Sequence, residues 1–307
     1  MTERAEGPIR TIWNPNAGSK AGLPTNRSKE EQLRGLMLRH GLGAELVPTR
    51  SEEEAAAATR EAAARGYAIV AAVGGDGTAG PIAFELLGSR TALGILPLGS
   101  AMNVARSLGI PRDLDAAAEI LAAREVRSID VAEANGVPFL EVGSIGLNAA
   151  IFGEAQRFAQ GDYSGLFGVV RALARYRPAR MRIQLDSQTV STRALMVAVA
   201  NAPYTGLGFT FAPDARLDDG LFDVRVYEHF SKRELVAHLW SIMLGRHAYS
   251  PKVRTYRSER VRVESRQPRP CRVDARDLGT TPVEFRLRRQ ALRVVVPPAD
   301  EVGPKTR

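Results

Sequence analysis

Residues 67 to 80, YAIVAAVGGDGTAG, restrict the fold of this chain more than any other segment. The continuous apolar run is typical of a strand that is buried on both faces of a parallel sheet. Gly74, Gly75 and Gly77 then leave the backbone bare, so their N–H groups are able to approach an anion closely. The helix expected from Gly80 to Leu87 would add its positive end. This segment predicts a strand, an anion-binding turn and a helix, in that order.

Strands and helices alternate along residues 1–129, which predicts a parallel sheet with helices on both faces. The expected strands are IRTIW at 9–13, YAIVAAV at 67–73 and LGILP at 93–97. The expected helix starts are the capping boxes Ser28–Glu31 and Ser51–Glu54, then Gly80, Ser100 and an Asp115 cap, with stops at Gly41 and Gly66. Ligands of such sheets bind at the carboxyl ends of the strands, where the loops NPNAG, GGDGT and LGSAMN all lie.

The sequence pattern changes near residue 130, and residues 130–290 predict a second domain of antiparallel strands. Short alternating or β-rich runs such as MRIQLDS, ALMVAVANA and LFDVRVYE are separated by turns. Two expected helices, GLFGVVRALARY at 165–176 and KRELVAHLWSIML at 232–244, interrupt them. We expect the C-terminal segment 291–307 to return to the first domain as a strand.

The net charge of +8 is concentrated near the C-terminus. Residues 252–293 contain thirteen Lys and Arg against five Asp and Glu, an excess equal to that of the whole chain. Such a segment could face anionic lipid, a polyphosphate or nucleic acid, or could be a solvated surface. It lacks the interleaved aromatic residues that stack on bases, so no nucleic acid partner is expected. No apolar run is long enough to span a membrane, and Cys271 is the only cysteine, so a cytoplasmic location is expected.

Three motifs, in order along the chain, resemble the diacylglycerol kinase family, which includes sphingosine kinases and bacterial lipid kinases: NPNAGSK, GGDGT and LGILPLGSAMNVARSLGIP. The segments NAPYTGLGFTFAPDARLDDGLFDV and RVDARDLGTTPVEFRLRRQALRVVVP also look like that family, so the resemblance covers nearly the whole chain. It implies an α/β nucleotide-binding domain, as in NAD kinases and diacylglycerol kinases, followed by an antiparallel β-sandwich domain. It also implies ATP and Mg²⁺ as cofactors and a lipid substrate at an anionic membrane surface, and it leaves a homodimer open.

The resemblance assigns roles to individual residues. It implies a nucleotide site formed by three loops and one threonine: Asn14, Pro15, Asn16, Ala17 and Gly18; Gly74, Gly75, Asp76, Gly77, Thr78, Ala79, Gly80 and Pro81; Ser100 and Asn103; and Thr49. Asp76 would hold Mg²⁺ through water or orient the acceptor hydroxyl. A second Mg²⁺ site would use the Asp219 carboxylate with the carbonyls of Arg216 and Leu221.

Four positions, in three motifs, depart from the family pattern. Gly80 and Pro81 replace an Asn-Glu pair, Asn103 replaces an acidic residue, and Arg276 replaces the glutamate that deprotonates the acceptor hydroxyl. An arginine does not act as a base at any accessible pH. Asp274 and Asp277 are therefore the candidate catalytic residues that could substitute, beside Asp76.

Three functional hypotheses follow. The first is an ATP- and Mg²⁺-dependent kinase of a diacylglycerol-like lipid that binds the membrane peripherally. The second is a nucleotide- or lipid-binding regulator with the kinase fold, since Arg276 replaces the expected base. The third is a kinase of a soluble substrate such as NAD, because NAD kinases also contain GGDGT. The LDDGLFDV segment favours the lipid kinases.

Overall fold

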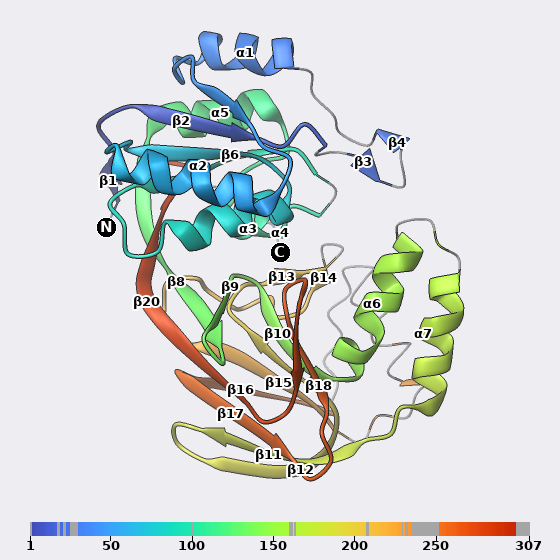
Figure 1. The fold of residues 1–307 in the computed structure, drawn as a ribbon. Coiled ribbons are helices and arrows are strands. Elements are labelled where there is room, and N and C mark those ends of the chain that lie inside the picture. The colour runs from blue at the N-terminus through green and yellow to red at the C-terminus, as the bar shows by residue number, and fades with distance from the viewer. Residues whose placement is uncertain are drawn as a thin grey trace. The chain divides into compact units, whose positions relative to one another are not determined.

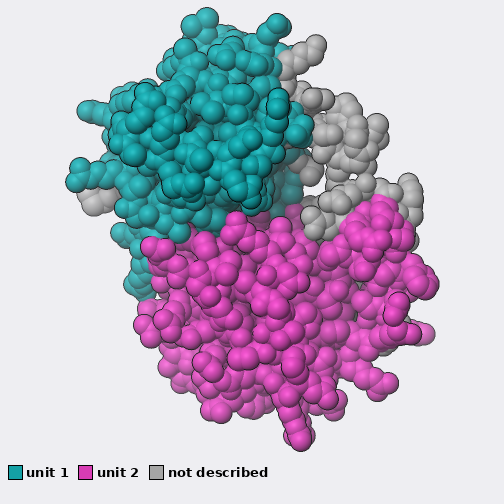
Figure 2. Space-filling view, viewed as in Figure 1, with its two compact units in different colours: residues 1–130, 289–307 teal, residues 131–288 magenta. Residues whose placement is uncertain are grey.

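The computed structural model describes residues 2–16, 19–20, 23–24, 30–99, 101–159, 162, 164–206, 209–228, 230, 233–234, 237 and 252–298. The chain forms two compact units, shown in different colours in Figure 2. The first unit contains residues 1–130 and 289–307, and the second contains residues 131–288.

The first unit contains a parallel sheet. Its strands run in the order β7-β6-β2-β5, and the end of β20 pairs parallel to β7 through Val294 and Leu93. The bounds are β2 Ile9–Trp13, β5 Leu46–Pro48, β6 Ile69–Gly74, β7 Ala92–Pro97 and β20 Val283–Val295. Short strands accompany them: β1 Glu3–Arg4 pairs with β8 Glu125–Ala134, and β3 Ser19–Lys20 pairs with β4 Leu23–Pro24. The parallel sheet expected from the sequence is confirmed.

Five helices accompany this sheet (Figure 1): α1 Glu30–Arg39, α2 Glu52–Ala64, α3 Asp76–Glu85, α4 Asn103–Ser107 and α5 Leu114–Ala123. Helix α1 contacts α5, and α2 contacts α3. The Ser51 side chain accepts the N–H of Glu54, as its capping box predicts. Gly41 and Gly66 follow α1 and α2 with φ of 64° and 76°, a conformation that suits glycine at a helix end.

Three helix starts differ from the sequence expectations. Helix α5 is capped by Asp113, whose carboxylate accepts the N–H of Ala116, so the expected Asp115 cap is wrong. Helix α3 begins at Asp76 rather than near Gly80, and α4 begins at Asn103. Asp115 already lies inside the first turn of α5, and its carboxylate pairs with Arg39 at the end of α1. The Ser28 cap lies outside the described residues.

The second unit is built from antiparallel strands in the order β19-β18-β10-β12-β11-β17-β20, and β15 pairs with β12 and β16. Their bounds are β9 Val137–Phe139, β10 Val142–Gly146, β11 Ala179–Leu185, β12 Thr189–Ala200, β15 Phe222–Glu228, β16 Val253–Ser258, β17 Arg260–Ser265, β18 Pro270–Val273 and β19 Arg276–Thr280. A separate pair, β13 Tyr204–Thr205 and β14 Phe209–Thr210, completes the set. The expected antiparallel domain is confirmed.

Strand β12 is apolar on both faces because it contributes to two hydrophobic clusters. Val197 and Val199 pack with Phe139, Phe222 and Phe285 in one cluster. On the opposite face, Met196, Ala198 and Ala200 pack with Phe211 and Tyr227 in a second cluster. This double burial accounts for the uninterrupted apolar run ALMVAVA in the sequence.

Two helices lie side by side in the second unit (Figure 1). Helix α7, Ser164–Arg175, was expected, whereas α6, Leu147–Ala159, was not. Helix α6 contacts β10, β12 and β18. Most of the helix expected at 232–244 lies outside the described residues. Within the part of the chain that the structure describes, no helix is long and apolar enough to cross a bilayer.

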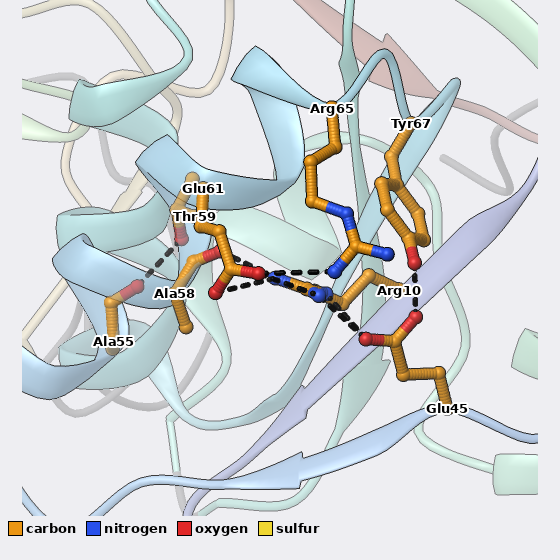
Figure 3. A network of polar contacts seen from close by, with 8 residues as sticks. All are labelled: Arg10, Glu45, Ala55, Ala58, Thr59, Glu61, Arg65 and Tyr67. Carbon is orange, nitrogen blue, oxygen red and sulfur yellow. Dashed lines mark hydrogen bonds and ion pairs between the residues drawn. The ribbon is translucent and has the colours of Figure 1, made fainter.

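A buried arginine joins three elements of the first unit (Figure 3). Arg10, on β2, is 3% exposed and forms ion pairs of 2.6 Å with Glu45 and 3.2 Å with Glu61 of α2. The Tyr67 hydroxyl donates to the other oxygen of Glu45, and the Arg10 guanidinium lies 4.9 Å from the Tyr67 ring centroid. The hydrogen bond from Tyr67 lowers the pKa of the Glu45 carboxyl, and Arg10 contributes to the same shift. The network therefore favours the ionised form of Glu45.

Tyr67→Phe should lower stability at neutral pH by about 1 kcal/mol, because it removes a hydrogen bond to a partly exposed carboxylate. The folded pKa of Glu45 lies below its ordinary value of 4.5, so this stabilisation is complete above that value. It is lost as the pH falls through the lower folded pKa. Urea unfolding of both proteins across this range should show the difference shrinking in acid. A difference that does not depend on pH would contradict the role given to Glu45.

Candidate functional site

Four strand ends meet at one edge of the parallel sheet. Trp13 is in register with Pro48 of β5 and Val73 of β6, and Gly74 is in register with Pro97 of β7. Hydrogen bonds continue past the strand ends: the N–H groups of Asn14, Leu98 and Thr49 donate to the carbonyls of Val73, Gly74 and Trp13 at 3.2, 3.0 and 2.8 Å. The loops that follow these strands are thereby brought together at the carboxyl edge, where parallel sheets bind ligands.

The first loop begins with a local turn. The Asn14 side-chain oxygen accepts the N–H of Asn16 at 2.9 Å across Pro15. Ala17 and Gly18 lie outside the described residues. Thr49 is 4% exposed. Both its backbone N–H and its hydroxyl donate to the Trp13 carbonyl, the hydroxyl at 3.5 Å. The Thr49 side chain thus fixes the junction of β2 and β5.

The Asp76 carboxylate connects the second loop to the third. Its two oxygens accept the N–H groups of Asn103 and Val104, each at 3.1 Å. These two residues open helix α4, so the carboxylate caps the first turn of that helix. Its negative charge lies at the positive end of the helix dipole, which is favourable. The sequence suggested that Asp76 faces a metal or an acceptor hydroxyl. The structure places both oxygens against backbone donors, which favours a role in positioning the two loops.

Glycine is required where the second and third loops touch. A Cβ added at Gly99 would lie 2.9 Å from the Cα of Gly75, and one at Gly74 would lie 2.4 Å from the hydroxyl oxygen of Thr78. Thr78 is 6% exposed, so its hydroxyl packs against Gly74 rather than opening to solvent. In contrast, a Cβ at Gly77 would meet nothing within 4 Å. The loop therefore leaves open space beside Gly77, at the first turn of α3.

That open space has the character of a phosphate site. Helix α3 begins at Asp76 directly after its N-cap, Gly75, whose carbonyl accepts the N–H groups of Thr78 and Ala79 at 2.9 and 3.0 Å. The N–H groups of Asp76 and Gly77 precede these bonds and have no carbonyl of the helix to reach, so they remain for an anion. Bare backbone, free space and the positive end of a helix are the features that favour an anion. The residues present thus fit the phosphate groups of a nucleotide.

Pro81 lies inside α3, five residues from its start, beside Ala79 and Gly80, which are buried. A proline in a helix interior removes the hydrogen bond to the fourth preceding carbonyl, here that of Gly77. The residue before a proline is disfavoured in helical geometry partly by its Cβ, and Gly80 has none. The Gly-Pro pair is therefore compatible with the helix but leaves the Gly77 carbonyl without its usual partner.

The third loop contains an unusual backbone conformation. Met102 has φ of 60° and ψ of 40°, the left-handed region that non-glycine residues rarely adopt, and its side chain is buried. Asn103 is 2% exposed and begins α4. Ser100 lies outside the described residues. Such conformations persist where the surroundings enforce them, and here the Asp76 carboxylate fixes the residue that follows Met102.

In the second unit, Asp219 lies in the turn before β15. One of its oxygens accepts the N–H of Leu221 at 3.1 Å, and the other pairs with Arg257 on β16. Arg257 also lies 3.9 Å from Asp223, its cross-strand partner. Burial raises the pKa of Asp223, Arg257 opposes this shift, and Asp219 adds to it. Arg257 thus supplies positive charge to a carboxylate pair.

The expected metal set is chemically suitable for Mg²⁺. It combines the Asp219 carboxylate with backbone carbonyls of Arg216 and Leu221, all hard oxygen donors. The Arg216 side chain pairs with Asp218 at 3.2 Å. This ion pair does not involve the Arg216 backbone carbonyl, which is the proposed metal ligand. Within the described ranges, no group of three or more His, Cys, Asp or Glu side chains has the arrangement of a metal site. Sequence reasoning missed Arg257, because only the β15–β16 register brings it to these carboxylates.

The two candidate bases, Asp274 and Asp277, differ in their surroundings from each other and from Arg276. Asp274, in the turn between β18 and β19, accepts the N–H groups of Leu140, Glu141 and Val142 at 2.9, 3.0 and 3.2 Å. Three donors of this kind hold the carboxylate in a structural role. The Asp277 side chain is 69% exposed and lies 3.7 Å from Arg272. Arg276 opens strand β19 and is exposed.

Comparison with known proteins agrees with this geometry. Residues 8–134 match the model of the diacylglycerol kinase catalytic domain, and residues 142–296 match that of the YegS C-terminal NAD kinase beta sandwich-like domain. A diacylglycerol kinase of Bacillus subtilis is 27% identical over 297 residues, which cover 94% of this chain and 96% of that protein. A Klebsiella pneumoniae protein named "Probable lipid kinase YegS-like" is 30% identical over 225 residues, covering 70% and 75% of the two chains.

A solved structure shares the fold. The crystal structure of a diacylglycerol kinase from Bacillus anthracis superposes with a TM-score of 0.72 at 21% identity, and the match covers 95% of this chain and 97% of that one. The family models together span both units of the chain, from the first parallel strand to the last strand. The chain therefore belongs to the family of diacylglycerol kinases and YegS-like lipid kinases.

Proposed function

We propose that this protein is an ATP- and Mg²⁺-dependent lipid kinase that transfers the γ-phosphoryl group to the hydroxyl of a diacylglycerol-like lipid. The observation on which this proposal depends is the open space beside Gly77 at the start of α3, next to the third loop. Family membership and the names of the relatives support the reaction class. Those names give no support to a soluble acceptor such as NAD.

In this proposal the loops bind and orient the nucleotide phosphates. The N–H groups at the start of α3 face the phosphate oxygens, and the Asp76 carboxylate keeps the third loop in place beside them. Phosphoryl transfer depends mainly on such positioning and on neutralisation of charge. When bound, ATP supplies the phosphoryl group, and Mg²⁺ held by Asp219 and its neighbouring carbonyls supplies positive charge.

The acceptor hydroxyl requires a base or must react without one. Asp277 is the better candidate of the two aspartates, because the oxygens of Asp274 are held by three backbone N–H groups. The loss of a general base typically lowers a rate by about 10²–10⁴-fold rather than abolishing it. We therefore expect the protein to phosphorylate its lipid slowly, because Arg276 occupies the position of the usual glutamate.

Helix α7 is proposed to contact the membrane that holds the lipid. Phe167 and Val170 on this helix are 72% and 54% exposed, and with Leu38 they are the large exposed apolar side chains among the described residues. Arg171 and Arg175 are exposed on the same helix. An amphipathic helix with exposed apolar and basic side chains is suited to lie in the interface of an anionic bilayer. This supports peripheral attachment of a cytoplasmic protein.

The kinase proposal is tested by transfer of labelled γ-phosphate from ATP to diacylglycerol, monoacylglycerol, phosphatidylglycerol and sphingosine. We expect a diacylglycerol product from the wild type. Gly77→Ala should lower kcat/KM for ATP by about a hundredfold, because its methyl group fills the space proposed for phosphate. Gly153→Ala on α6 is the matched control, since it is also a helical glycine whose Cβ would meet nothing within 4 Å.

Both glycine variants should fold at least as stably as the wild type, because alanine favours helices by up to about 1 kcal/mol. Loss of transfer in Gly77→Ala therefore cannot be assigned to unfolding. If no lipid is phosphorylated while ATP still raises the melting temperature, the kinase proposal is wrong. A gain of transfer in Arg276→Glu would then identify a nucleotide-binding regulator with the kinase fold.

The membrane contact is tested by sedimentation with vesicles of increasing phosphatidylglycerol content. Binding should increase with anionic lipid and decrease with salt. Phe167→Ser should weaken binding roughly tenfold, the loss expected when one buried phenyl group is removed from the interface. Leu38→Ser on α1 removes a side chain that is 83% exposed and serves as the control. Equal effects of the two substitutions would exclude α7 as the contact.

A further inference from the structure

A groove lined by arginines lies on the second unit, over strands β11, β12 and β17 and the turn that follows β17. It consists of two adjoining hollows of about 660 and 470 Å³. Both hollows are lined by Arg180, Arg193 and Arg266; Arg182 lines only the larger and Arg269 only the smaller. The kinase proposal does not use any of these residues.

The strand register places two of these positive charges directly opposite each other. Arg180 of β11 is the cross-strand partner of Arg193 of β12, and both side chains are exposed. Like charges at opposite positions of an antiparallel pair are destabilising. The acidic side chain in the lining, Glu264, is the cross-strand partner of Arg182 but accepts the Nε–H of Arg262 at 2.8 Å. The lining thus has five arginines and this one carboxylate. The groove therefore concentrates positive charge that its own lining does not neutralise.

Several other strand arginines of the same unit are paired with carboxylates. Arg286 lies 2.7 Å from Glu284, and Arg288 lies 3.2 Å from Glu133. Among the residues that the structure describes, Arg180, Arg182, Arg193 and Arg266 form no ion pair. Arg260, outside the groove, also forms no ion pair among the described residues and lies opposite Arg286. What distinguishes the groove is that four such arginines line one hollow.

The lining also has features that fix the guanidinium groups and add donors. The Arg269 guanidinium lies 5.3 Å from the Tyr176 ring centroid, which holds its plane. Ser191 and Thr192 contribute hydroxyl groups beside the arginines. The guanidinium fork matches phosphate oxygens in bidentate geometry, and several forks in one groove suit a ligand with more than one phosphate group.

We propose that this groove binds a ligand bearing two or more phosphate groups, at a site separate from the glycine loops. Phosphate oxygens would lie between Arg180 and Arg193 and convert their repulsion into shared attraction. The ligand chemistry is the same for a soluble oligophosphate and for clustered phosphate headgroups of lipids. The inference is independent of whether the protein phosphorylates lipid.

The test compares the double variant Arg180→Gln/Arg193→Gln with the matched control Arg286→Gln/Arg288→Gln. Each removes two exposed arginines from strands of the same unit, so the change in net charge is equal. Each also relieves one pair of opposed arginines, because Arg286 lies opposite Arg260, but only the control breaks ion pairs. One arm titrates tripolyphosphate by calorimetry, and the other measures binding to phosphatidylcholine vesicles that contain phosphatidic acid. The glycine loops are identical in the two variants, so their contribution cancels in the comparison.

The groove variant should bind the responsive probe at least about tenfold more weakly than the control. If the groove variant binds tripolyphosphate more weakly than the control does, the ligand is a soluble oligophosphate. If only vesicle binding is weakened, the ligand is a cluster of lipid headgroups. Equal losses in both variants and both arms would overturn the proposal. The groove variant should also melt at or above the wild-type temperature, because it removes a repulsive pair. A lower melting temperature for the groove variant than for the control would contradict that repulsion and with it the inference.

Discussion

The Asp76 carboxylate determines how the nucleotide side of this protein is built. It belongs to the second loop, and both of its oxygens are bonded to N–H groups that open the helix of the third loop. Helix α4 has five residues, too short to be stable through its own hydrogen bonds, so it depends on this cap. The left-handed Met102 and the contact between Gly75 and Gly99 are consequences of the same junction.

Glycines in this junction serve two different purposes, close packing of the backbone and open space for an anion. Gly74 and Gly99 are glycine because another atom occupies the place of a side chain, whereas Gly77 is beside open space. Packing explains the first two positions, and packing does not explain the third. The proposed phosphate site therefore rests on Gly77 and the start of α3 rather than on the number of glycines in the loop.

Local sequence signals were sufficient to predict most of the fold. The site was harder to predict, because its side chains form hydrogen bonds with residues far away in the sequence. Ser51 caps α2 as expected, and the apolar run before Gly74 forms a strand with parallel neighbours on both sides. The roles of Asp76 and Asp274 were not predictable, because their hydrogen-bond partners lie 27 and 134 residues away. The opposition of Arg180 and Arg193 likewise depends on strand register. Helix α6 was missed although LNAAIFGEAQRFA has helical composition.

The central claim is that the bare N–H groups at the start of α3 receive the nucleotide phosphates. Residue-resolved amide hydrogen exchange, with and without saturating ATP and Mg²⁺, measures this directly. The account predicts that exchange at Asp76 and Gly77 slows markedly when ATP is present, while exchange at Gly153 on α6 does not change. Saturated ATP binding with unchanged exchange at Asp76 and Gly77 would contradict it, because the phosphates would then lie elsewhere.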